Sequence, residues 1–153
     1  MGEKKSTAEL DKILGKLNPD NIRNFFEENV SSLFIGKNEF SRYMRKRFKE
    51  KGYTQQQIFL RADIPERYGY KLISGQKHTN KRDVIIKLCV AGRFSLTETN
   101  RALKLYGMNE LYSRIPRDAL IMNMILSQSF SIDALNYQLH HNGFDELSSF
   151  SIE

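Results

Sequence analysis

Residues 52–75 read GYTQQQIFLRADIPERYGYKLISG, and this stretch decides the fold of the middle of the chain. Thr54 is a favourable N-cap for a short helix whose inner face carries Ile58 and Ala62. The tripeptide at 63–65, Asp-Ile-Pro, predicts a tight turn, because proline fits the first turn of the helix that follows. The first half of the stretch is therefore a short capped helix ending in a turn.

The second half predicts a helix over 65–74. Tyr68 and Leu72 lie four residues apart and face inward, as does Ile64 in the turn, and Gly75 ends the helix. The side chains left outward are long and polar, basic or aromatic: Glu66, Arg67, Tyr70 and Lys71, with Lys77 in the loop that follows. Two short helices of which the second exposes such side chains have the shape that enters the major groove of DNA.

The charge of the chain is concentrated around this stretch. The net charge is +6 overall, but it is −1 over residues 1–36, +10 over residues 37–93 and −3 over residues 94–153. A scattered excess would serve solubility alone, whereas a concentrated one indicates a polyanionic partner such as nucleic acid or anionic lipid. The middle third of the chain is therefore the candidate nucleic-acid-binding region.

Apolar residues recur at three- and four-residue spacing throughout, and strand-like alternation is nearly absent, so the sequence predicts an all-α protein. The helix at 38–51, for example, carries Phe40, Met44 and Phe48 on one stripe. The full set of predicted helices is 7–17, 20–29, 38–51, 54–62, 65–74, 81–91, 95–106, 117–127 and 131–142. The lone cysteine, Cys89, lies in an apolar run and is expected in the core.

The segment 38–96 resembles the phage-repressor-like helix-turn-helix family, the XRE family. That family's pattern has a Gly, an apolar residue and Thr-Gln-x-x-apolar, then a turn, an exposed helix, a Gly and a basic loop. The residues that match it, without a gap, are Gly52, Thr54, Gln55, Ile58, Ile64, Leu72 and Gly75. The resemblance implies a DNA-binding domain with its recognition helix at 65–74.

The resemblance also implies roles for individual residues. Thr54 and Gln55 are expected at the DNA, with Gln55 contacting a phosphate, and Lys77 would contact another phosphate. The base edges would be met from the outer face of the recognition helix, by Glu66, Arg67 and Lys71, with Tyr70 on the same face.

Three positions depart from the family pattern. Asp63 stands where a turn glycine is usual, and it tolerates left-handed geometry better than most residues. Gly69 takes a usually apolar position, where glycine weakens a helix by about 1 kcal/mol against alanine. Phe48 and Ile73 replace a frequent Arg–Glu pair, an exchange of charges for apolar groups that is often neutral or stabilising.

The carboxy-terminal half contains an internal repeat. Residues 94–113 and 130–149 are identical at eight of twenty positions, and the similarity extends upstream to the Arg-Asp pairs at 82–83 and 117–118. Each copy predicts one αα-hairpin, and two such hairpins bury their apolar faces by stacking. The second copy is equally compatible with a surface for a second chain.

The sequence gives no sign of an enzyme, a cofactor, a metal site or a small-molecule ligand. His78 and the pair at 140–141 have no Cys or carboxylate at metal-ligand spacing, and no phosphate-binding glycine loop is present. No apolar run approaches the length of a bilayer span, and one cysteine suits a reducing compartment. We therefore expect a cytoplasmic protein that does not insert into a membrane.

These observations divide the chain into a helical extension at 1–36, a helix-turn-helix domain at 37–96 and a helical repeat region at 97–153. The expected function is sequence-specific binding of double-stranded DNA as a transcriptional regulator. The alternative is a helical adaptor that keeps a repressor-like fold and binds another protein. We also expect a homodimer formed mainly through residues 117–149, which are rich in apolar side chains and contain one basic residue, Arg117.

Overall fold

The computed structural model describes residues 5–29 and 38–148, and these residues form helices and no strand. The all-α prediction is therefore confirmed for the part of the chain that is described. The chain divides into two compact units, residues 1–36 and residues 37–153, which we consider separately.

The first unit contains two short helices and a turn of 3-10 helix. α1 spans Thr7–Lys16, the 3-10 turn Pro19–Asn21 and α2 Ile22–Glu28, where the sequence predicts one continuous second helix. The Asn18 side chain accepts a hydrogen bond from the backbone N–H of Asp20 and so caps the 3-10 turn that Pro19 begins. No residue of α1 is fully buried, and Leu14 is 42% exposed, so the first unit covers the apolar side chains of this helix only in part.

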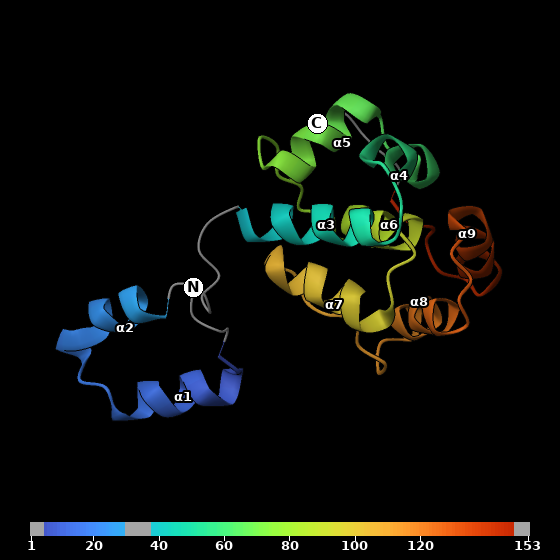
Figure 1. The fold of residues 1–153 in the computed structure, drawn as a ribbon. Coiled ribbons are helices and arrows are strands. Elements are labelled where there is room, and N and C mark those ends of the chain that lie inside the picture. Colours follow the sequence, from blue (N-terminus) through green and yellow to red (C-terminus); the bar gives the residue numbers. More distant parts are fainter. Residues whose placement is uncertain (1–4, 30–37, 149–153) are drawn as a thin grey trace. The chain divides into compact units, whose positions relative to one another are not determined.

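The second unit holds the remaining helices, shown in Figure 1. They are α3 (Asn38–Glu50), α4 (Gln55–Ala62), α5 (Glu66–Ser74), α6 (Arg82–Ala91), α7 (Leu96–Leu105), α8 (Pro116–Leu126) and α9 (Ile132–His141). Every boundary lies within one residue of its predicted position. The reason is local: hydroxyl caps at Thr54, Ser95 and Ser131 start three of these helices.

The core of the second unit is built around α6. Every residue from Val84 to Ala91 is buried, and the helix packs against α4, α7 and α9. Cys89 is fully buried among them, and burial raises the pKa of its thiol, which confirms the prediction of a core residue. α3 packs against this core through the three apolar residues predicted to share one face: Phe40, Met44 and Phe48 are at most 5% exposed.

The two copies of the repeat, α6–α7 and α8–α9, are joined by two equivalent arginine–aspartate ion pairs. Arg82 of the first copy donates to both carboxylate oxygens of Asp118, at 2.9 and 2.7 Å. Arg117 of the second copy donates to both carboxylate oxygens of Asp83, at 3.0 and 2.9 Å. Each arginine also donates to two backbone carbonyls of the loop that follows its own hairpin. The hairpins therefore stack within one chain, as the sequence predicts.

Candidate nucleic-acid interface

The pair α4–α5 is fixed at its start by a reciprocal cap. Thr54 Oγ1 accepts from the backbone N–H of Gln57 at 3.2 Å, and the Gln57 side-chain oxygen accepts from the backbone N–H of Thr54 at 2.9 Å. Gln55 is the first residue of α4 and is partly buried. The hydroxyl of Thr54 thus serves the helix, while the exposed first turn of α4 keeps backbone N–H groups available to an anion.

The turn between the two helices has the geometry expected of its sequence. Asp63 adopts a left-handed conformation with φ 55° and ψ 46°, the geometry that the sequence predicts this residue to tolerate. Ile64 is 6% exposed and points into the core, and Pro65 is the N-cap residue of α5. Phe48 and Ile73 are both 1% exposed and lie in the core.

Gly69 permits a close approach of α5 to α4. It is buried, and a Cβ built on it would lie 2.5 Å from Cδ1 of Phe59, far inside van der Waals contact. The sequence predicts Gly69 only as a weak point of α5, and this interpretation is incomplete, because the missing side chain is what lets the Phe59 ring fit. Phe59, 1% exposed, was not among the predicted inner residues of α4.

The same ring positions an aromatic side chain on the outer face of α5. Tyr70 is 42% exposed and meets Phe59 edge to face, with ring centroids 5.1 Å apart. Next to it, Glu66 is exposed and accepts a long hydrogen bond of 3.5 Å from the side-chain amide of Gln56 in α4. Tyr70 and Glu66 are therefore both tied to α4, which restricts where they point.

The basic side chains of this face are differently placed. Arg67 and Lys77 are exposed and Lys71 is partly buried. Gly75 turns the chain in a left-handed conformation, with φ 85°, and the backbone N–H of Lys77 donates to the carbonyl of Lys71 at 3.1 Å. This hydrogen bond keeps the loop against the end of α5. Among residues 5–29 and 38–148, none of the three basic side chains forms an ion pair.

Part of the positive charge at 37–93 is neutralised inside the unit. Glu98 of α7 pairs with Lys51 at 2.8 Å and with Arg47 at 3.4 Å, while Arg82 is paired with Asp118. Burial alone would raise the pKa of Glu98, but the Lys51 ammonium and the Ser95 N–H lower it below its usual value. Within 37–93, the exposed basic residues without an ion pair in the described ranges are Arg45, Lys46 and Lys49 on α3, Arg67 on α5, Lys77 in the loop after α5, and Arg93 after α6.

Comparison of the chain with family models, with curated proteins and with solved structures gives no match. Within the described ranges, no helix has the length and apolarity needed to cross a bilayer. Over the same residues, no three His, Cys, Asp or Glu side chains gather closely enough to hold a metal ion. The case for a function therefore depends on the geometry and charge of the residues themselves.

Proposed function

We propose that this chain binds double-stranded DNA in a sequence-specific manner, as a helix-turn-helix protein of the phage-repressor-like type. In this proposal α5 lies in the major groove and the role is transcriptional regulation. The observation that carries it is a closely packed helical pair whose second helix and following loop carry Arg67, Lys71 and Lys77, none of which forms an ion pair in the described residues. Cations that the protein does not use internally are suited to a polyanion.

The proposed contacts follow from the chemistry of each group. Arg67, near the start of α5, reaches base edges and forms a bidentate pair with N7 and O6 of guanine. Lys71, one turn later, reaches the same groove. Glu66 is restrained by Gln56 and accepts from the N4 amino group of cytosine, the base contact that suits a carboxylate.

Phosphate contacts flank this base-reading face. The first turn of α4 offers backbone N–H groups and the Gln55 side chain, and a helix N-terminus favours an anion. Lys77 supplies a second contact from the loop that Gly75 turns. Tyr70, which is held against Phe59, presents an aromatic surface to the DNA between these two phosphate contacts.

Selection from a random duplex pool tests this proposal directly. We expect one sequence motif to be enriched and the affinity for it to fall steeply with salt, since each phosphate contact contributes about −0.9 to the slope of log K against log salt. Lys77→Gln should reduce this slope by about 1, whereas Lys104→Gln, which removes an exposed charge from α7, should change it less. Failure to bind any duplex at low salt would refute the proposal.

A protein-binding adaptor is the second candidate, and one observation favours it. Leu60, on α4, is 83% exposed, the largest exposed fraction among the large apolar side chains of the described residues. An apolar side chain presented in this way fits a protein partner better than a phosphate backbone. Leu60→Ser separates the candidates, because it should leave DNA affinity unchanged and weaken a protein complex.

We also propose that the chain forms a homodimer through residues 117–149 and binds an inverted repeat. Dimers of this class present two recognition helices about 34 Å apart, one turn of DNA. Most apolar side chains of this region are already used within the chain: Ile121, Ile125, Ile132, Leu135, Leu139 and Leu147 are buried. Leu126, 67% exposed, remains available to a second chain.

A further inference from the structure

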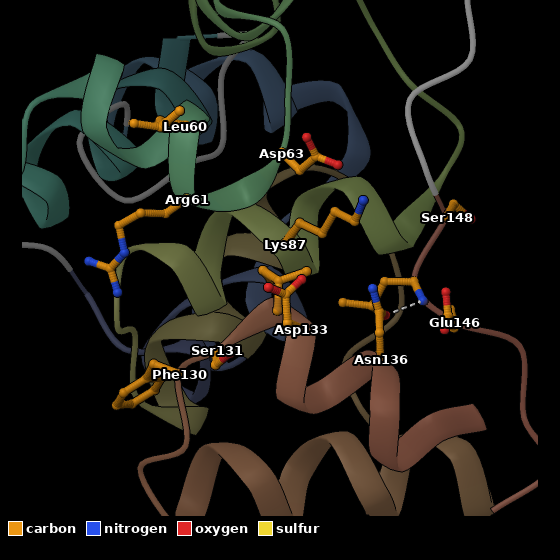
Figure 2. Close-up of a pocket in the computed structure, with 12 residues that line it drawn as sticks. Leu60, Arg61, Asp63, Lys87, Phe130, Ser131, Asp133, Asn136, Glu146 and Ser148 are labelled. Atoms are coloured by element: carbon orange, nitrogen blue, oxygen red, sulfur yellow. Dashed lines mark hydrogen bonds between the residues drawn. The ribbon is translucent and has the colours of Figure 1, made fainter. Parts of the chain in front are cut away.

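A cleft with mixed charge lies between the end of α4, the middle of α6 and the start of α9. Figure 2 shows Lys87 of α6 between Asp63 on one side and Asp133 and Asn136 of α9 on the other. The segment after α9 closes the cleft, where the side-chain oxygen of Asn136 accepts from the backbone N–H of Leu147 at 2.8 Å. Three separate parts of the second unit thus meet around one lysine.

Lys87 is unusual among the charged residues of the described chain. It is 3% exposed, yet it forms no ion pair or hydrogen bond with a described residue. Burial lowers the pKa of its ammonium group, and the negative charges of Asp63 and Asp83 oppose this shift only in part. Among the described residues, only Nε of Arg47 is a fully buried side-chain nitrogen or oxygen without a partner, so Nζ of Lys87 still reaches the solvent of the cleft. Partial desolvation of an ammonium group without a close partner costs stability, so its place needs an explanation.

The second copy of the repeat shows which side chain the position of Lys87 can hold in this hairpin. In the second copy the residue equivalent to Lys87, five positions after the shared arginine, is Met122, which is partly buried and packs against the core. The hairpin therefore accepts an unbranched apolar side chain here. The first copy differs at this position: it holds a lysine, Lys87, and the side chain of this lysine lines the cleft.

The donors in the cleft fit a carboxylate. Besides the three N–H groups of Lys87, the side-chain amide of Asn136 has its oxygen occupied by Leu147 and its N–H groups without an acceptor in the described residues. An ammonium and an amide are a donor set that a single carboxylate satisfies, and charge-assisted hydrogen bonds of this kind are strong.

The remaining charges in the cleft restrict the rest of the ligand. Asp63, Asp133 and Glu146 are exposed carboxylates, so with Arg61 and Lys87 the lining has a net charge of −1. Arg61 is turned toward Tyr53, with its guanidinium carbon 4.8 Å from the ring centroid. A ligand with several negative charges would therefore be repelled, while a cationic group beside the carboxylate would be attracted.

We propose that this cleft binds a small zwitterion of the amino-acid class. Its carboxylate bonds to Lys87 and Asn136, and its ammonium group lies against the carboxylates of Asp133 and Glu146. The ligand would contact α4, α6 and α9 together and give the buried lysine its missing partner. This inference does not depend on DNA binding.

The test uses the full-length chain without DNA, titrated calorimetrically with each free amino acid in turn and with acetate and inorganic phosphate as partial probes. At least one amino acid should bind more tightly than acetate by about tenfold, because both of its charges are used. Phosphate should bind no better than acetate. Equal binding of that amino acid and acetate, or no binding by any amino acid at millimolar concentration, would overturn the proposal.

Two variants and a control assign the binding to the cleft. Lys87→Met, which introduces the residue of the second copy, should fold and lose at least tenfold in affinity for the amino acid. Asp133→Asn should lose affinity for the amino acid and keep its affinity for acetate. Lys104→Met, on α7, removes the same charge away from these lining residues and should bind as the wild type does. Undiminished binding by a folded Lys87→Met variant would place the ligand elsewhere and overturn the proposal.

Discussion

Gly69→Ala should destabilise the second unit even though alanine is the better helix former. Helix propensity alone favours alanine by about 1 kcal/mol. The new methyl group, however, would lie 2.5 to 2.7 Å from three ring carbons of Phe59, among them Cγ at the root of the ring. The ring is 1% exposed and already meets Tyr70, so it cannot move away freely.

Overpacking of this kind costs about 1–3 kcal/mol, and the short contacts place Gly69→Ala near the upper end. The net loss is therefore about 2 kcal/mol in the free energy of unfolding, or about 8 °C in Tm for a domain of this size. Urea and thermal unfolding followed by circular dichroism measure it. In a Phe59→Leu background the same substitution should be neutral or stabilising. A Gly69→Ala protein as stable as the wild type would refute the close approach of α4 and α5.

Three further predictions concern the core and the assembly. Asp83→Asn should lower the free energy of unfolding at pH 7 by about 2 kcal/mol, because Asp83 accepts charge-assisted hydrogen bonds from Arg117 and further bonds from Ser148. Those bonds outweigh burial and lower the pKa of Asp83, so its contribution is complete above about pH 4 and is lost as the pH falls through the lowered pKa. The deficit of Asp83→Asn should therefore shrink in acid unfolding curves, and a deficit independent of pH would contradict this. Lys87→Met should raise the free energy of unfolding at pH 7 by about 1 kcal/mol in the absence of ligand, measured in urea, and a loss of stability would show that the ammonium is already satisfied. Leu126→Glu should shift sedimentation from dimer to monomer at tens of micromolar, and a dimer that persists would place the interface elsewhere.

The helices could be predicted from the sequence because their signals are local. Thr54, Ser95 and Ser131 cap helices through their own side chains, and Gly75 and Gly107 adopt the left-handed conformations that end or follow helices. Such signals act over three or four residues and do not depend on the rest of the fold. The outward position of Arg67 follows from the helical period of α5, while Lys77 follows from the position of the loop after Gly75.

The contacts between helices could not be predicted in this way. Spacing along one helix does not say how α5 crosses α4, so it does not reveal that Phe59 occupies the space above Gly69. The repeat brings the Arg-Asp pairs to notice, but the exchange between Arg82 and Asp118 appears only when the hairpins are stacked. Lys87 reads as one polar residue in an apolar run, and its cleft is formed by segments far apart in the sequence.

Binding by an Arg67→Ala variant to the selected duplex and to an unrelated duplex tests the central claim most directly. If Arg67 reads a base from α5, the substitution costs about 1–3 kcal/mol on the selected duplex and much less on the unrelated one. Arg67→Lys keeps the charge and loses the bidentate geometry, so it should show the same selective loss. Equal losses on both duplexes would show that Arg67 contacts only phosphate and would contradict the proposed recognition by α5.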